Sequence, residues 1–203
     1  MGYVLYDYLP SGNGYKCRLT MKALGIPYEL VKVDIVAGAT RTPEFLAVNP
    51  NGKIPVLMVP GRGPLAESHA IINFLAEGTK LMPADSFARA LVWQWLCFEQ
   101  YQLEPGAATV RFWLKSLRKT PAELGEKYTE RFQRGADALA VLERALAGRR
   151  WLVGEDVTLA DIGLFAYTHV ADEAGYRLED YPAIGAWIAA FKQQPWYSPI
   201  TAP

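Results

Sequence analysis

The sequence predicts two domains of different class, a mixed α/β domain over residues 1–80 and an all-α domain over residues 87–203. Short β-branched and aromatic segments alternate with turn clusters in the first part. From about Ser86 onward, the apolar residues recur only at helical spacing. Gly78, Pro83 and several polar residues mark the boundary between the two patterns.

The first domain is expected to have the element order β-α-β, loop, β-β-α. Its predicted strands are short apolar runs next to turn residues: 4–8, 28–34, 54–58 and 64–66. Its predicted helical segments are 15–24, part of 37–47, and 70–76. Pro43 suits the first turn of the short middle helix. Ser68 is the expected N-cap of the last helix.

The second domain is expected to contain only helices. The predicted helices are 89–101, 126–146, 158–170 and one that begins at Pro182. Residues 90–98 are apolar at nearly every position, so this helix is expected to be covered on more than one side. Thr158 and Asp161 have the spacing of a capping box, which favours a structural role for Asp161.

The composition excludes several classes of function. Twenty-one Lys and Arg residues balance 21 Asp and Glu residues, and the zero formal net charge argues against nucleic acid or an anionic membrane as the main partner. Cys17 and Cys97 have no metal-ligand or CxxC spacing, and two histidines are too few for a His-based metal site, so no metal is expected. Neither a signal peptide nor a stretch of 18 apolar residues is found, so a reducing cytoplasm is expected.

Three local patterns in the first domain form the candidate functional site: 11–16 (SGNGYK), 49–57 (NPNGKIPVL) and 67–71 (ESHAI). In this order and spacing they resemble the N-terminal, thioredoxin-like domain of glutathione transferases. Residues 158–161 resemble the capping motif of that family's helical domain, so the resemblance covers essentially the whole chain. The Ser-x-Asn-x-x-Lys pattern is similar to bacterial, serine- or asparagine-type members (theta/nu-like) more than to the tyrosine-using ones.

The resemblance implies how the second pattern would hold glutathione. The bond before Pro55 would be cis, and the backbone of Ile54 would pair with the cysteinyl backbone of glutathione like one more strand. Lys53, with Arg41 as a weaker candidate, would hold the glycyl end.

The third pattern would hold the other end of the tripeptide. Glu67 and Ser68 come just before a predicted helix, where free N–H groups and the helix dipole favour a carboxylate. The resemblance implies that Ser68 donates to the γ-glutamyl carboxylate and that Glu67 accepts from the α-amino group.

Ser11 and Asn13 are the candidate catalytic residues, because the thiol of glutathione must become a thiolate to react. Lowering a thiol pKa of about 8.5 by ~2 units takes roughly 2.7 kcal/mol. One hydrogen bond to a charged group supplies about 1.5–3 kcal/mol, and a helix N-terminus about 0.3–1 kcal/mol. Ser11 is the first choice and Asn13 the second, with Tyr8 as a competing hydroxyl. Cys17 is expected to be a small buried hydrophobe rather than a nucleophile.

The second domain is expected to line a pocket for the electrophile, with Tyr101, Arg111 and Trp113 as candidates. An unpaired Arg111 beside aromatic side chains would orient an anionic group or the thiolate. The family is generally dimeric, and the apolar helix over residues 90–98 is consistent with a homodimer.

The resemblance implies a cytoplasmic detoxification enzyme that conjugates its co-substrate glutathione to small hydrophobic electrophiles. Two alternatives stay open. One is a glutathione-dependent disulfide reductase or peroxidase on the same scaffold, which Asn13 as the main donor would favour. The other is a non-catalytic adaptor, against which the complete set Lys53, Pro55, Glu67 and Ser68 counts.

Overall fold

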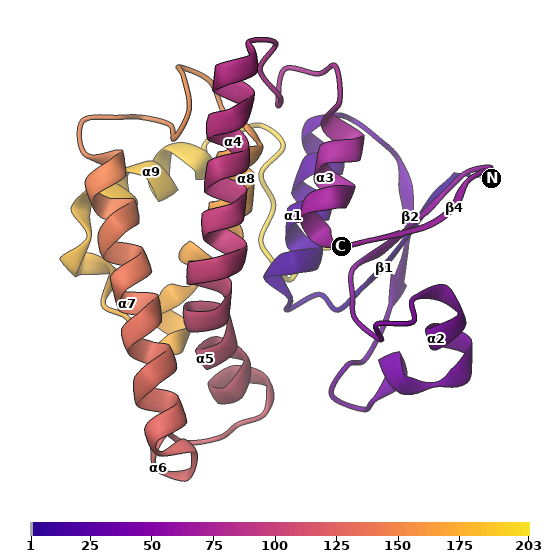
Figure 1. Cartoon of the computed structure of the whole chain (residues 1–203), viewed down its shortest axis with the longest axis horizontal. Helices are drawn as coiled ribbons and strands as arrows, with labels where there is room; N and C mark the ends of the chain where they lie inside the picture. Colours follow the sequence, from indigo (N-terminus) through magenta and orange to yellow (C-terminus); the bar gives the residue numbers. More distant parts are fainter. Residues whose placement is uncertain (1) are drawn as a thin grey trace. The chain divides into compact units, whose positions relative to one another are not determined.

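The structure, a computed structural model, describes residues 2–203 and divides into two compact units (Figure 1). The α/β unit consists of the chain up to Thr79 together with Pro195–Pro203. The helical unit is Lys80–Gln194. The predicted fold class, a thioredoxin-like α/β part followed by an all-α part, is confirmed.

A four-stranded mixed sheet forms the centre of the α/β unit, in the order β2-β1-β3-β4. The strands are β1 (Tyr3–Asp7), β2 (Tyr28–Lys32), β3 (Val56–Val59) and β4 (Gly63–Ala66). β1 and β2 are parallel, with Leu5 opposite Leu30, because a helix connects them. β3 is antiparallel to both neighbours, and Leu57 lies opposite Leu5 and Leu65.

Helices cover this sheet because alternate residues of each strand point to opposite faces. Two of them, α1 (Gly12–Ala23) and α3 (Ser68–Ala76), pack side by side (Figure 1). The short helix α2 (Pro43–Val48), which follows the 3₁₀ turn η1 (Ala39–Arg41), contributes Phe45 to a cluster with Val33 and Val56. Tyr6 packs edge-on against Phe45 with 6.2 Å between the ring centroids.

The helix starts in this unit follow the sequence with one exception. Pro43 occupies the first turn of α2, as predicted, and the Thr42 hydroxyl accepts a hydrogen bond from Phe45 N–H. For α3, the N-cap is Glu67 rather than Ser68, and Ser68 is already the first helical residue.

The segment Pro195–Pro203 packs within the α/β unit. The Tyr15 hydroxyl donates to the carbonyl of Ser198 at 2.5 Å, and the Arg18 guanidinium donates to the carbonyl of Ala202. The side chain of Ile200 is buried. Both hydrogen-bond donors lie on α1, so this segment holds α1 in place.

The helical unit is built from long helices and short turns. Its elements are α4 (Ser86–Phe98), the π-helical η2 (Glu99–Ala108), α5 (Thr109–Arg111), the π-helical η3 (Phe112–Ser116), α6 (Pro121–Leu124), α7 (Glu126–Leu146), α8 (Leu159–Thr168), the 3₁₀ turns η4 (Ala171–Ala174) and η5 (Leu178–Asp180), and α9 (Pro182–Lys192). The predicted helix 126–146 is α7, and Pro182 begins α9 as predicted.

The centre of the helical unit is α8, every residue of which is buried. The Asp161 carboxylate accepts hydrogen bonds from the Thr158 and Leu152 N–H groups, each at 3.0 Å, and from Trp187 Nε1 at 3.0 Å. The capping box is present, so the predicted structural role of Asp161 is confirmed.

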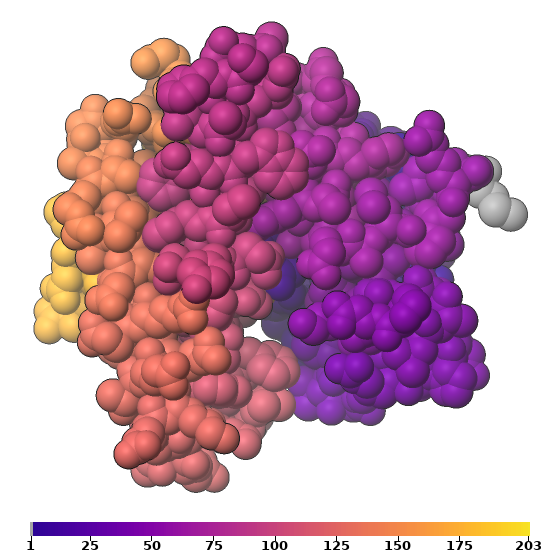
Figure 2. All heavy atoms as spheres, in the orientation of Figure 1, coloured from indigo at the N-terminus to yellow at the C-terminus, as the bar shows by residue number. Residues whose placement is uncertain are grey.

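Helix α4 differs from the prediction in length and in exposure. It begins three residues before the predicted helix and passes directly into η2, where Pro105 lacks the N–H that an α-helical ladder needs. Phe87 is 71% exposed and Trp93 is 39% exposed. Atoms of α4 lie on the surface that Figure 2 presents. Within this chain, therefore, one face of the apolar helix is uncovered.

Candidate functional site

The start of α1 carries both predicted catalytic residues. Ser11 is the N-cap, with extended backbone angles, and its side chain makes no capping hydrogen bond. Its N–H donates to the Tyr8 carbonyl at 2.7 Å, and its carbonyl accepts from Tyr15 N–H at 3.0 Å. The half-buried Ser11 hydroxyl therefore lies at the positive end of the helix but does not cap it.

Asn13 lies in the first turn of α1 and connects two of the predicted motifs. Its Oδ1 accepts a hydrogen bond from Lys16 Nζ at 2.9 Å and contacts the Ser68 hydroxyl at 3.5 Å. The helix periodicity accounts for the first contact, since Asn13 and Lys16 are three residues apart. The packing of α1 against α3 accounts for the second.

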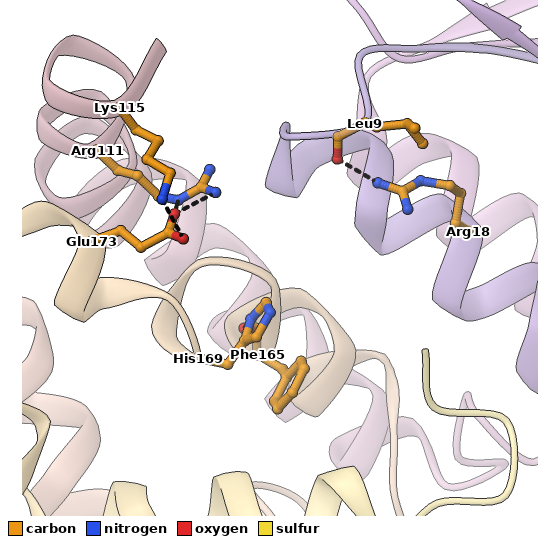
Figure 3. Close-up of polar contacts among 7 residues, drawn as sticks. All are labelled: Leu9, Arg18, Arg111, Lys115, Phe165, His169 and Glu173. Carbon is orange, nitrogen blue, oxygen red and sulfur yellow. Dashed lines mark hydrogen bonds and ion pairs between the residues drawn. The ribbon is translucent and has the colours of Figure 1, made fainter. Parts of the chain in front are cut away.

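A buried ion pair, Asp7 with Arg18, lies behind this turn. Arg18 Nε is 2.8 Å from Asp7 Oδ2, and a second guanidinium nitrogen donates to the Leu9 carbonyl at 2.7 Å (Figure 3). Burial raises the pKa of the Asp7 carboxyl, and the Arg18 charge opposes that shift. Asp7 Oδ1 accepts no hydrogen bond from the described residues.

This pair was not predicted from the sequence. Its only sequence signals are an acid at the end of an apolar strand and an Arg in the following helix. Gly14 fits directly against the carboxylate, because a Cβ atom at Gly14 would lie 1.6 Å from Asp7 Oδ1. The pair and the glycine together fix the loop from Asp7 to Gly14, on which Ser11 and Asn13 lie.

The second motif places a backbone segment next to the sheet. The Ile54–Pro55 peptide bond is cis, as the resemblance implies. Ile54 precedes β3 and is not paired with a neighbouring strand. Its backbone N–H and C=O therefore lie outside the ladder.

The loop before Ile54 is braced by Asn49, whose side chain is buried. Asn49 Nδ2 donates to the Lys53 carbonyl at 2.8 Å, and Asn49 Oδ1 accepts from Asn51 N–H at 3.1 Å. The side chains of Lys53 and Arg41 are exposed. Arg41 donates to the Asn51 carbonyl at 3.3 Å, which places this cation at the same loop as Lys53.

Glu67 has a backbone conformation that non-glycine residues rarely adopt. Its φ is 69°, at the N-cap of α3, and the side chain makes no capping hydrogen bond. Such a conformation costs about 1–3 kcal/mol and is concentrated at functional sites. Glu67 is exposed and Ser68 is buried, so the two polar groups predicted to act together occupy opposite environments at one helix start.

Cys17 is fully buried, as predicted. Its Sγ lies 3.7 Å from the Asn13 carbonyl, and burial raises the pKa of the thiol. A protonated thiol is a poor nucleophile, so Cys17 does not fit a role in attack.

The expectation of an unpaired Arg111 was wrong. Arg111 Nε donates to Glu173 Oε2 at 2.8 Å, and Lys115 Nζ lies 3.0 Å from the other oxygen of Glu173 (Figure 3). Because Glu173 is 62 residues further along the chain, no local pattern reveals the pair.

The other two pocket candidates lie on different segments. Tyr101 is on η2 and 69% exposed, with the Arg134 guanidinium 5.0 Å from its ring centroid. Trp113 is half-buried on η3.

His169 belongs to the packing of the helical unit. Its ring stacks on Phe165 with 4.4 Å between centroids, and Nδ1 lies 2.7 Å from the Phe165 carbonyl (Figure 3). Burial lowers the pKa of His169 to about 4. No cluster of three or more potential His, Cys, Asp or Glu ligands for a metal is found in residues 2–203. No helix within that range combines the length and apolar character that spanning a membrane requires.

Comparisons with known proteins match this geometry. Residues 1–77 match the family model "Glutathione S-transferase, N-terminal domain", and residues 95–195 match "Glutathione S-transferase, C-terminal domain". The crystal structure of a glutathione S-transferase from Pseudomonas fluorescens is 45% identical, with a TM-score of 0.95 over 100% of both chains.

Three further relatives have names that describe different kinds of protein. A glutathione transferase family member from Pseudomonas fluorescens, with two glutathione bound, is 31% identical over 96% of this chain and 90% of that one, with a TM-score of 0.81. Disulfide-bond oxidoreductase YfcG from Escherichia coli is 31% identical over 93% of this chain and 89% of that protein. Protein URE2 from Eremothecium gossypii is 28% identical over 96% of this chain, which spans 66% of that protein.

Proposed function

We propose that this chain, which belongs to the glutathione S-transferase family, binds glutathione on its α/β unit. The proposed reaction is conjugation of the glutathione thiolate to small hydrophobic electrophiles. The observation that carries the proposal is the contact of Asn13 with Ser68. It brings the proposed thiolate site at the start of α1 next to the proposed carboxylate site at the start of α3. A tripeptide that reaches both sites needs its sulfur and its γ-glutamyl end close to this contact.

The three motifs supply complementary groups for each part of glutathione. The unpaired backbone of Ile54 suits the cysteinyl backbone, because an extended peptide adds to free N–H and C=O groups. Glu67 accepts from the α-amino group, and Ser68 with the α3 N-terminus binds the γ-glutamyl carboxylate. The exposed cations Lys53 and Arg41 are proposed to attract the glycyl carboxylate.

Ser11 and Asn13 are proposed to stabilise the thiolate. The Ser11 hydroxyl is not used in capping, so it retains its donor for a ligand. The Asn13 amide turns its oxygen toward Lys16, which leaves its Nδ2 group directed elsewhere. One charge-assisted hydrogen bond from either group, about 1.5–3 kcal/mol, together with the helix N-terminus, meets the roughly 2.7 kcal/mol that a pKa lowered by ~2 units requires.

The test is the double variant Ser11→Ala, Asn13→Ala. We expect calorimetric binding of glutathione to persist while conjugation to an aryl halide falls about 100-fold, the equivalent of the lost thiolate stabilisation. Tyr8→Phe is the matched control, since it removes the competing hydroxyl and is expected to leave the rate unchanged. Conjugation at the unaltered rate in the double variant would refute the assignment.

A second candidate reaction is glutathione-dependent disulfide reduction, in which the bound glutathione thiolate attacks a glutathionylated disulfide, displaces the other sulfur as a thiolate and forms glutathione disulfide. The contact of Asn13 Oδ1 with Lys16 supports it, because an amide whose oxygen faces a buried cation turns its Nδ2 donors away from that cation, and such donors also stabilise a thiolate leaving group. The named activity of the Escherichia coli relative supports it as well. Turnover of a glutathionylated disulfide that exceeds aryl conjugation would select this reaction, and absence of glutathione binding at millimolar concentration would exclude both.

We further propose a cytoplasmic homodimer that associates through the exposed face of α4. Exposed apolar surface can mark an association site, and the exposed aromatic residues Phe87 and Trp93 both lie on this helix. Sedimentation velocity tests the dimer, and Trp93→Asp is expected to yield the monomer.

A further inference from the structure

Lys16 is a buried cation at the proposed thiolate site. Its side chain is fully buried in α1, and Nζ lies 2.9 Å from Asn13 Oδ1 and 3.3 Å from His69 Nε2. Burying an ammonium group is costly unless acceptors surround it. A lysine in this position therefore needs a reason beyond packing, since an apolar side chain of similar volume would fill the space at lower cost.

The chemistry of the ammonium group determines how the Asn13 side chain is turned. An ammonium has three donors and no acceptor, whereas a side-chain amide has an acceptor at one end and two donors at the other. Lys16 Nζ can therefore face only the oxygen of Asn13, and the Ser68 hydroxyl contacts the same oxygen at 3.5 Å. The Nδ2 group must then point away from Lys16.

The direction of the amide decides the sign of its interaction with a thiolate. A thiolate attracts the N–H groups of Nδ2 and repels a carbonyl oxygen, so a rotated Asn13 would oppose the charge that it is proposed to stabilise. Without Lys16, no ammonium group excludes the rotated direction of the amide, and only the 3.5 Å contact from the Ser68 hydroxyl, among the contacts described above, still favours the observed one.

We propose that Lys16 is a positioning residue that holds the Asn13 amide with Nδ2 directed at the sulfur of glutathione. This inference rests on the proposed function and deepens it, because it assigns the thiolate-stabilising role of Asn13 to a specific buried contact. It also gives the buried lysine in the second turn of α1 a role that an apolar side chain could not fill.

Other charged and titratable groups near Lys16 are common to all the variants compared below. His69 faces it from α3, where the 3.3 Å contact requires Nε2 to be the acceptor. Asp7 on β1, and Lys16 and Arg18 on α1, each lie within electrostatic range of Cys17. Differences between variants therefore report the altered side chain.

The experiment measures the pKa of the glutathione thiol in the binary complex, from the ultraviolet absorbance of the thiolate as the pH is varied. The variants are Lys16→Met, Asn13→Ala and the double change. We expect Lys16→Met to raise the pKa of the bound thiol by about one unit, a roughly tenfold loss of thiolate at a fixed pH below that pKa. In the Asn13→Ala background, Lys16→Met is expected to produce no further shift.

Two additional variants complete the design. Lys22→Met removes a cation from the last turn of the same helix and is expected to leave the thiol pKa unchanged. Lys16→Arg retains both the positive charge and the donors. We expect the thiol pKa in this variant to stay closer to the wild-type value than in Lys16→Met. If Lys16→Met does not fold, as judged by circular dichroism, Lys16→Ala replaces it in the same measurement.

The outcomes separate this inference from the proposed function. A wild-type complex whose thiol pKa equals that of free glutathione overturns the proposed function. A wild-type complex with a lowered thiol pKa that Lys16→Met leaves unchanged overturns only the role of Lys16. A full additional shift from Lys16→Met in the Asn13→Ala background also overturns it, because Lys16 would then act without Asn13.

Discussion

The variant Gly14→Ala tests whether the Asp7 carboxylate holds the loop that carries Ser11 and Asn13 in place. In Gly14→Ala, the new Cβ would lie 1.6 Å from Oδ1, 2.0 Å from Cγ and 2.4 Å from Oδ2 of Asp7. All three atoms belong to a fully buried side chain that Arg18 holds at 2.8 Å. Relief of the overlap must therefore displace the carboxylate from its partner.

The expected cost follows from two opposing effects. Disrupting a buried ion pair costs about 3–5 kcal/mol, while alanine gains about 1 kcal/mol over glycine inside a helix. We expect Gly14→Ala to lower the free energy of unfolding by about 2–4 kcal/mol, the difference between these two contributions.

Urea denaturation followed by circular dichroism measures this change. Gly185→Ala is the matched control, because Gly185 lies inside α9 with nothing within 4 Å of an added Cβ, and this change is expected to be neutral or stabilising. In an Asp7→Ala background, the penalty of Gly14→Ala should largely disappear, since the overlapping atoms are gone. A penalty of less than about 1 kcal/mol in the native background, or one that persists without Asp7, would show that the carboxylate is not the obstacle.

Three other changes probe the rest of the molecule. Asn13→Asp keeps the acceptor toward Lys16 but loses the Nδ2 donor and adds a negative charge. We expect kcat/KM for conjugation to be lower than in Asn13→Ala by about tenfold or more. Equal rates in the two variants would contradict the donor role of Asn13. Asp161→Ala leaves the buried donors of Thr158, Leu152 and Trp187 without their acceptor and should cost at least about 3 kcal/mol of stability in urea denaturation, and an unchanged midpoint would contradict the capping role. For His169, the folded-state pKa of about 4 lies below the ordinary value of 6.5, so the unfolded chain binds the proton first and stability falls as the pH drops from about 6.5 to 4. His169→Gln should remove about 2.5 kcal/mol of this loss at pH 4.5, measured as the difference in unfolding free energy between pH 7 and pH 4.5, and the same difference in both proteins would argue against a neutral buried imidazole.

Local patterns were sufficient for most of the elements and for one structural motif. The order of strands and helices, the place of Pro43 and the capping box of Asp161 all depend on residues close together in the sequence. Such features follow from side-chain spacing and from the missing N–H of proline. The buried state of Cys17 was also predicted, from the apolar character of a free thiol.

Contacts between distant segments were not predictable in this way. Glu173 pairs with Arg111 from another element, and periodicity gives no signal for such a partner. Lys16 belongs to the Ser-x-Asn-x-x-Lys pattern, but local spacing does not indicate that its side chain is fully buried beside Asn13. The uncovered face of α4 was not predictable for the same reason. The sequence shows that this helix is apolar, but not which segments pack against it.

The α/β unit is discontinuous in the chain, and this affects how it can be made. Translation delivers Ser198 183 residues after Tyr15, and Ala202 184 residues after Arg18, the two α1 side chains that donate hydrogen bonds to them. A nascent chain that has reached only Thr79 has not yet received these acceptors. An excised fragment should therefore be more stable when residues 195–203 are grafted back onto it through a short linker than when it is cut at Thr79 alone.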